Sequence, residues 1–157
     1  MIDLYGNSIE NNYIDPKKII LLDLNYTLIS NSGKCYGRYP ERIYQQRYEK
    51  ELIDMVKDNY VILITARPGV YKDATLEHIE ERTGFVPDES YWNTGVGNKG
   101  MSPPNLKEYW LNNEIFPKHG DDPQKYYAIE SNSQTRAMYK RLGIHSNRKQ
   151  EIMAKYK

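Results

Sequence analysis

The chain has few of the features that mark secreted, membrane-bound or strongly charged proteins. Cys35 is the one cysteine among 157 residues, which excludes an internal disulfide framework and favours a reducing compartment. No stretch approaches the roughly 20 apolar residues that a membrane-spanning helix needs. The first residues, Met-Ile-Asp-Leu-Tyr-Gly-Asn, lack the charged and apolar regions of a signal peptide. The sequence therefore predicts a cytoplasmic protein without membrane association.

Net charge is also slight, at +1 from 22 lysines and arginines against 21 aspartates and glutamates. Such a chain creates no overall field that attracts polyanions, so any contact with nucleic acid must be local. The three histidines are scattered without the spacing of zinc ligands. The glycines at positions 95, 97 and 100 precede no helix of a βαβ unit, so a dinucleotide-binding fingerprint is not supported.

Apolar runs and helical periodicities alternate along the chain, which is typical of an α/β, doubly wound parallel sheet flanked by helices. The predicted strands cover residues 18–22, 60–64 and 126–129, with short ones near 85–86 and from 144. The predicted helices cover 41–58, 73–82 with Asp73 as a cap candidate, a segment from 104, and a segment after 130 that ends before Gly143.

We expect a single domain over residues 1–157, with a core at about 17–145, a polar N-terminal arm and a basic C-terminal tail. A chain of this length can bury roughly two-thirds of the surface that its unfolded form exposes. Only 42 positions (65 minus 23) separate the first two candidate motifs. A helix uses most of them, so at most a minimal cap domain fits.

Residues 18–28, Lys-Ile-Ile-Leu-Leu-Asp-Leu-Asn-Tyr-Thr-Leu, carry the most information. A short apolar run fits a strand buried on both faces of a parallel sheet, and ligands gather beyond the carboxyl ends of such strands. Asp23 ends this strand and is therefore a candidate nucleophile. The alternative is that Asp23 only caps the turn that follows.

Three later segments each supply a further polar side chain that could join Asp23 at this site. Thr65 ends a second apolar strand, Lys107 falls in the first turn of a predicted helix, and Glu130 ends a third strand. This order resembles the haloacid dehalogenase superfamily of phosphohydrolases over roughly residues 17–145. Within that superfamily, residues 128–144 and the Lys107 segment are similar to the 3′-phosphatase domain of phage polynucleotide kinase.

The resemblance implies a reaction and a set of roles. Asp23 would attack phosphorus and form an aspartyl-phosphate, which water then hydrolyses. Mg²⁺, a hard cation that takes oxygen ligands, would be held by Asp23, Glu130 and the backbone carbonyl of Asn25. Thr65 would donate a hydrogen bond to the phosphoryl group, and Lys107 would bring positive charge beside it and Asp23.

Two positions depart from the family's pattern. The family's phosphatases usually have a general acid two residues after the nucleophile, but an amide such as Asn25 cannot exchange a proton at neutral pH. General acid catalysis contributes about 10²–10⁴-fold, so poor leaving groups should react slowly. Ser131 stands where a second acidic residue usually follows Glu130, which predicts weaker Mg²⁺ binding. Asn25 is compatible with a native departure and with an aspartate that was replaced to trap substrate.

Two arginines are candidates for substrate binding. Arg67 follows the second strand and is either a phosphate contact or a solvated loop charge. Arg38 belongs to residues 34–42, which interleave cations and rings in a predicted flap over Asp23. That pattern suits phosphates and stacked bases, although the chain's 15 tyrosines make local clusters common.

Three functions remain open. The first is a Mg²⁺-dependent phosphatase acting on a phosphorylated small molecule or nucleic-acid end. The second is a catalytically degenerate domain that binds a phosphorylated ligand. The third is an interaction module in which the basic tail 148–157 docks a protein partner. The intact Asp23, Thr65 and Lys107 favour the phosphatase.

Overall fold

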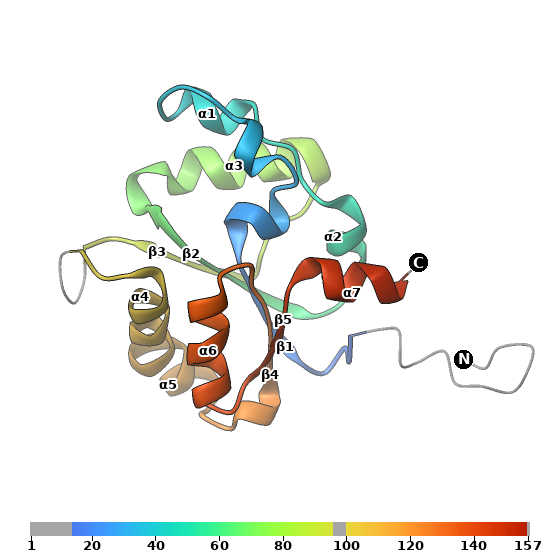
Figure 1. The fold of residues 1–157 in the computed structure, drawn as a ribbon, viewed down its shortest axis with the longest axis vertical. Helices are drawn as coiled ribbons and strands as arrows, with labels where there is room; N and C mark the ends of the chain where they lie inside the picture. The colour runs from blue at the N-terminus through green and yellow to red at the C-terminus, as the bar shows by residue number, and fades with distance from the viewer. Residues whose placement is uncertain (1–13, 96–99, 157) are drawn as a thin grey trace, which may run out of the picture.

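A single parallel five-stranded sheet in the order β3-β2-β1-β4-β5 forms the centre of the molecule. We describe it from a computed structural model, which covers residues 14–95 and 100–156 (Figure 1). The strands are β1 (Ile19–Leu22), β2 (Tyr60–Pro68), β3 (Glu89–Asn93), β4 (Tyr126–Ile129) and β5 (His145–Asn147). The sheet grows from β1 to one side through β2 and β3 and to the other through β4 and β5. The predicted doubly wound α/β fold is therefore confirmed.

Successive strands are added first on one side of β1 and then on the other, so the topological switch point lies between β1 and β4. Leu22, the last residue of β1, is in register with Leu63 of β2 and Ile129 of β4. The residues that follow, Asp23 and Glu130, therefore leave the sheet side by side, and the Asp23 N–H donates to the Ile129 carbonyl at 3.0 Å. Open α/β sheets bind ligands at such a switch point, beyond the carboxyl ends of the strands.

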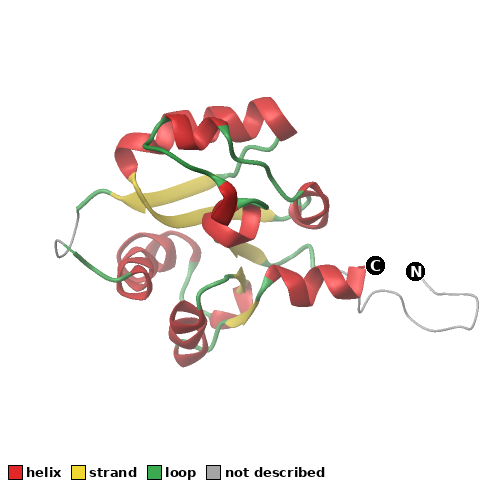
Figure 2. Cartoon of the chain, turned by 45° about the horizontal axis from the view of Figure 1, so that its top comes forward, coloured by secondary structure: helices red, strands yellow, loops and turns green. Residues whose placement is uncertain are grey.

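Helices cover both faces of the sheet, which explains why its strands are apolar on both sides (Figure 2). Successive residues of β1 show this, because Ile20 packs in the core on one face and Leu21 in the core on the other. Helices on the first face are α2 (Lys50–Val56), α3 (Lys72–Thr83) and α7 (Lys149–Tyr156), with α1 (Glu41–Tyr44) against α3. Helices on the second face are α4 (Pro103–Trp110), α5 (Phe116–His119) and α6 (Ser133–Arg141).

The single helix predicted over residues 41–58 is wrong. The chain leaves helical conformation after Tyr44 and re-enters it only at Lys50. Residues 47–49 instead exchange backbone hydrogen bonds of 2.8 and 2.9 Å with residues 28–30, which follow the first turn after β1. These long-range bonds satisfy backbone groups that a continuous helix would have satisfied locally, so tertiary pairing overrides the periodicity.

Other boundaries differ by smaller amounts. Tyr71, and not Asp73, is the N-cap of α3, and Lys107 is the fifth residue of α4 instead of lying in its first turn. The edge strand near residue 85 lies at β3, a few residues later than predicted.

The ends of the chain differ in how much of them is described. Part of the predicted basic tail forms α7, whose Ile152 is buried in the core of the first face. The N-terminal arm up to residue 13 and the loop position Gly97 lie outside the described residues. Across the described part of the chain, no helix has both the length and the apolar character to traverse a bilayer.

Candidate active site

Asp23 lies directly after β1, and side chains from three parts of the chain hold its carboxylate. Asp23 Oδ2 accepts hydrogen bonds from Thr27 Oγ1 at 2.9 Å and from Ser131 Oγ at 2.8 Å. Asp23 Oδ1 accepts one from Lys107 Nζ at 3.0 Å. The side chain caps no backbone N–H of the turn Leu24–Leu28 that follows it. Its bonds run to other side chains and to the backbone N–H of the distant Ser131 instead, which does not support the capping alternative.

Lys107 reaches from α4 to the two carboxylates that follow β1 and β4. Its Nζ lies 3.0 Å from Asp23 Oδ1 and 2.5 Å from Glu130 Oε1, and the residue is 2% exposed. Burial by itself would lower the pKa of Lys107, but the charges of the two carboxylates outweigh it and raise that pKa. The lysine is therefore an ammonium ion at neutral pH.

The two carboxylates respond to this environment in opposite directions. Burial favours a higher pKa for Asp23, but the Lys107 ammonium and hydrogen bonds, one of them from Ser131, outweigh it and lower the pKa. Burial also raises the pKa of Glu130, where Lys107 only partly offsets it and the charge of Asp23 adds to it. Asp23 is thus the group that stays ionised, which is the state a nucleophile requires.

The oxygen atoms beside Asp23 form a donor set that suits a hard cation. Ser131 Oγ lies 2.8 Å from Asp23 Oδ2 and 3.3 Å from the backbone oxygen of Asn25, so three oxygens of different kinds converge. Glu130 adjoins them, and both of its carboxylate oxygens already accept hydrogen bonds. No cluster of three or more His, Cys, Asp or Glu occurs within residues 14–95 and 100–156. The donors fit Mg²⁺ in type but carry little charge.

Arg67 is a second buried cation close to the site. Its side chain donates to Asn25 Oδ1 at 3.0 Å, to Thr75 Oγ1 at 3.0 Å and to Gln46 Oε1 at 3.2 Å. Arg67 is 3% exposed and belongs to β2. The interpretation of Arg67 as a solvated loop charge is therefore wrong.

The guanidinium of Arg67 keeps unused capacity to bind an anion. Its three side-chain partners are neutral, and its Nε has no partner within the described residues. Burial lowers the pKa of Arg67, but a guanidinium remains charged in proteins. The ring of Tyr39, from the flap, lies 5.2 Å from the guanidinium carbon and covers it. A buried cation without an anionic partner is stabilised by any anion that reaches it.

Asn25 and Thr65 both contact Arg67, at different parts of the residue. The side-chain oxygen of Asn25 accepts from the Arg67 guanidinium, and the hydroxyl of the buried Thr65 accepts a hydrogen bond from the Arg67 backbone N–H at 3.1 Å. The residue after Asn25 is Tyr26, whose φ of 60° lies in the left-handed region that non-glycine residues seldom adopt. Tyr26 is 60% exposed. The turn after Asp23 thus carries an aromatic ring to the solvent at the edge of the site.

The structure brings most of the predicted site residues together. Asp23, Lys107 and Glu130 form one hydrogen-bonded cluster, and Asn25 connects it to Arg67 through its backbone and side-chain oxygens. Arg38 is not part of this arrangement. It lies in the exposed flap, where its carbonyl accepts a backbone hydrogen bond from the start of α1. Its role in substrate binding stays a prediction.

Four contributing side chains were missed in the sequence. Ser131 was interpreted only as a lost carboxylate, although it donates to Asp23. Tyr39 belongs to the ring-and-cation pattern of the flap, which was a usable signal. Gln46 and Thr75 lie 21 and 8 residues from Arg67 and belong to no motif. Only the folded chain brings these last two to the guanidinium.

Comparison with known proteins supports the fold. No family model matches the chain, and no curated protein is similar to it in sequence. One similar solved chain comes from the Pnkp1/Rnl/Hen1 RNA repair complex, with a TM-score of 0.62, 23% identity, and coverage of 87% of this chain and 44% of that one. A second, from a structure of the Pnkp1/Rnl/Hen1 complex, has a TM-score of 0.64, 22% identity, and coverage of 87% and 48%. The chain spans about half the length of these structural neighbours.

Proposed function

We propose that this chain is a haloacid dehalogenase-type phosphatase that uses Mg²⁺ and an aspartyl-phosphate intermediate, and that its substrate is a phosphate-terminated nucleotide or nucleic acid. The observation that carries the proposal is the buried ammonium of Lys107 between Asp23 and Glu130. These groups lie at the switch point of the sheet, where a phosphoryl group would meet both a nucleophile and a cation.

Asp23 is the nucleophile because its neighbours keep it ionised and fix its direction. One carboxylate oxygen forms a bond to phosphorus while the bond from phosphorus to the leaving oxygen breaks in line with it. Lys107 and Arg67 supply positive charge for the phosphoryl oxygens, and Thr65 supplies a hydroxyl. Water then attacks the aspartyl-phosphate, which releases inorganic phosphate and restores the carboxylate.

Asp23, Glu130 and the Asn25 carbonyl would hold Mg²⁺, with the Ser131 hydroxyl where a second carboxylate is usual. When bound, Mg²⁺ supplies electrostatic stabilisation of the phosphoryl charge. Its affinity is low here, because affinity for a hard cation follows the charge and number of its oxygen ligands.

Asn25 limits the substrates that react quickly. Its amide, hydrogen-bonded to Arg67, has no proton to transfer to the departing oxygen. A leaving group that carries its own negative charge well, such as an aryl oxide or another phosphate, departs without such help. A sugar hydroxyl departs slowly.

Two observations support a nucleotide or nucleic-acid substrate. The structural neighbours belong to an RNA repair complex. An exposed ring also borders the site, since Tyr26 on the turn after β1 is 60% exposed and lines a pocket with Ser131. Bases stack on such aromatic faces with about 1–3 kcal/mol each.

The decisive experiment is turnover of an aryl phosphate with Mg²⁺, because this substrate does not need the missing acid. We expect turnover by the wild-type chain, none by Asp23→Ala, and binding of beryllium fluoride at the Asp23 carboxylate in a crystal. Turnover retained by Asp23→Ala, or fluoride bound elsewhere, would overturn the proposal. Asn112→Ala, at an exposed position on the second face, is the matched control.

A second candidate function is binding of a phosphorylated ligand without turnover. It is favoured by neutral residues at both departures, Asn25 and Ser131, each of which is hydrogen-bonded where the family has a carboxylate. This function predicts that beryllium fluoride or inorganic phosphate binds while no substrate is hydrolysed under any Mg²⁺ concentration. The aryl phosphate assay therefore separates the two candidates.

A further inference from the structure

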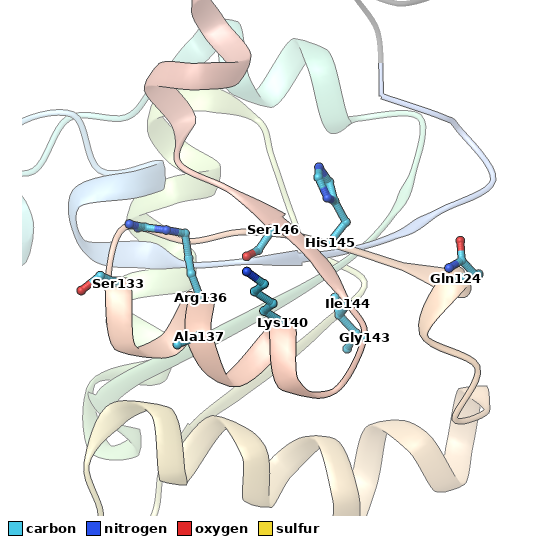
Figure 3. Close-up of a pocket in the computed structure, with 9 residues that line it drawn as sticks. All are labelled: Gln124, Ser133, Arg136, Ala137, Lys140, Gly143, Ile144, His145 and Ser146. Carbon is cyan, nitrogen blue, oxygen red and sulfur yellow. The ribbon is translucent and has the colours of Figure 1, made fainter.

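A groove of about 820 Å³ lies at the open edge of the sheet, between β5 and α6. Figure 3 shows Arg136 and Lys140 extending from α6 toward β5, where Ser146 lies opposite them. Because β5 ends the strand order, no further strand among residues 14–95 and 100–156 covers this edge. The other lining residues are Gln124, Ser133, Ala137, Gly143, Ile144 and His145.

The lining chemistry is that of an anion site. Arg136 and Lys140 are four residues apart on α6, so they lie on one face of the helix, about 6 Å apart along its axis. Hydroxyl groups of Ser133 and Ser146 add neutral donors, and none of the described lining residues is acidic. Glu151 is paired with Arg148 at 3.0 Å, and its pKa is lowered by hydrogen bonds from Arg148 and also by the charge of Arg136.

The groove adjoins the loop that holds Glu130 and Ser131. Arg136 Nη1 donates to the backbone oxygens of Glu130 at 3.1 Å and Ser131 at 2.7 Å. Ser133, at one end of the groove, is two residues beyond Ser131, whose hydroxyl contacts Asp23. A long anion bound along α6 would therefore reach the active site without crossing another element.

The groove fits a chain of phosphates better than a single one. Its two cations are separated along the helix, so they contact successive charges of an extended polyanion instead of converging on one group. Grooves of positive charge that follow the backbone are how proteins hold single-stranded nucleic acid without reading its sequence. Serine and glutamine side chains commonly contribute to such phosphate contacts.

We propose that this groove binds the phosphodiester backbone of a single-stranded polynucleotide and leads its phosphorylated end to Asp23. The proposal rests on the proposed function and narrows its substrate class from phosphate-terminated compounds in general to polynucleotides. Lys140 is the residue that tests it, because its exposed side chain makes no described hydrogen bond or ion pair. Arg136 is unsuitable, since it also supports the Glu130 loop.

The test measures binding of a fluorescent single-stranded oligonucleotide with a 3′-hydroxyl, so that no phosphatase activity is required. Lys140→Glu should weaken binding about three- to tenfold, as expected for loss of one charge-assisted contact. The slope of log affinity against log salt should become shallower by about 0.7, the value for one phosphate contact on a single strand. Equal melting temperatures of variant and wild type would show that folding is unaffected.

Lys57→Glu is the control, because it makes the same charge change at the exposed C-cap of α2, on the opposite face of the sheet, where it removes only an exposed ion pair with Asp54. We expect it to bind the oligonucleotide as the wild type does. The proposed role of the groove would be refuted if Lys140→Glu and Lys57→Glu lost the same affinity or if Lys140→Glu bound as tightly as the wild type. It would also be refuted if the wild type did not bind the oligonucleotide. Equal affinity of the wild type for polyglutamate would overturn it as well, by favouring an acidic protein segment.

This outcome is independent of catalysis. If the aryl phosphate is not hydrolysed but the oligonucleotide binds through Lys140, the proposed phosphatase activity is refuted and polynucleotide binding in the groove is supported. If the aryl phosphate is hydrolysed and the oligonucleotide does not bind, the phosphatase activity is supported and the role of the groove is refuted.

Discussion

Replacement of Asn25 by aspartate tests the chemistry of the site most directly. Asn25 Oδ1 accepts a hydrogen bond from Arg67 at 3.0 Å, and Arg67 is 3% exposed. A carboxylate has nearly the shape of the amide, so Asn25→Asp requires no repacking. It restores the acidic group of the family's phosphatases and also gives the buried guanidinium an anionic partner.

The first expected effect is on stability. Unit charges about 4 Å apart attract by about 4 kcal/mol at an effective dielectric constant of about 20, and removing the carboxylate from water offsets most of this gain. We expect a net increase of about 1 kcal/mol in the free energy of unfolding, which corresponds to a melting temperature about 2–4 °C higher. Asn112→Asp, at an exposed position, adds the same charge without this partner and should leave the melting temperature nearly unchanged.

The second expected effect is on the reaction. For an oligonucleotide with a 3′-phosphate, the departing sugar oxygen needs a proton, so Asn25→Asp should accelerate cleavage by up to about 10²–10⁴-fold. For an aryl phosphate the gain should be much smaller, because its leaving oxygen carries charge well. Arg67 lowers the pKa of the introduced carboxyl group, so the protonated form that donates becomes more abundant as pH falls. The gain for the oligonucleotide should rise in the same direction.

The assay is the ratio of the two accelerations, measured on one protein preparation at several pH values. Equal gains for both substrates would refute the general-acid reasoning. No gain for either would favour ligand binding without turnover, because metal binding or geometry would then be limiting. A melting temperature that does not rise would refute the role assigned to Arg67.

Two further predictions concern the metal and the far end of the sheet. Ser131→Asp should tighten Mg²⁺ binding, measured by calorimetry, and raise any phosphatase activity, because it adds a charged ligand. A Mg²⁺ affinity that neither Ser131→Asp nor Glu130→Ala changes would contradict the proposed set of metal ligands. Burial alone would raise the pKa of Glu89, but hydrogen bonds from Lys118, Tyr60, His119 and Tyr91 lower it from 4.5 to about 2. Because the folded-state pKa is the lower one, this carboxylate adds stability that is present above about pH 5 and is lost as pH falls toward 2, by at most about 3 kcal/mol. Denaturant unfolding at several pH values should show a smaller loss in Glu89→Gln, and identical losses would refute the assignment.

The sequence predicts best those features of the fold and site that depend on where the apolar strands end. Asp23 and Glu130 follow apolar runs, and parallel strands present their carboxyl ends at one edge, so their proximity follows from the pattern alone. The helix over 41–58 was wrong for the opposite reason. Its periodicity is real, but the backbone bonds between residues 28–30 and 47–49 depend on the turn after Asp23, and no local pattern encodes that pairing.

Arg67 shows the same limit within the site. Its position near the end of a strand was visible in the sequence, but its burial depends on Gln46 and Thr75, which lie on separate segments and accept its hydrogen bonds through neutral oxygens. Buried charge is normally paired. A sequence offers no means of identifying a cation whose partners are all uncharged, so the interpretation of Arg67 as an exposed charge was the favoured one until the fold brought these segments together.

Asn25 and Ser131, the two departures from the pattern of the haloacid dehalogenase superfamily, have a common effect on the charge of the site. Lys107 and Arg67 carry two positive charges and Asp23 is ionised, while burial and the charge of Asp23 raise the pKa of Glu130, so these side chains carry at most two negative charges against two positive ones. Aspartates at positions 25 and 131 would each add a negative charge, leaving a site that depends on Mg²⁺ to admit a phosphoryl dianion. With Asn25 and Ser131, the two buried cations at least offset the charge of the carboxylates, and the side-chain hydrogen-bond partners of Arg67 are all neutral. The neutral residues Asn25 and Ser131, to which we attribute weak metal binding and the lack of a proton donor in the proposed function, would therefore also reduce the electrostatic barrier to binding a phosphorylated ligand.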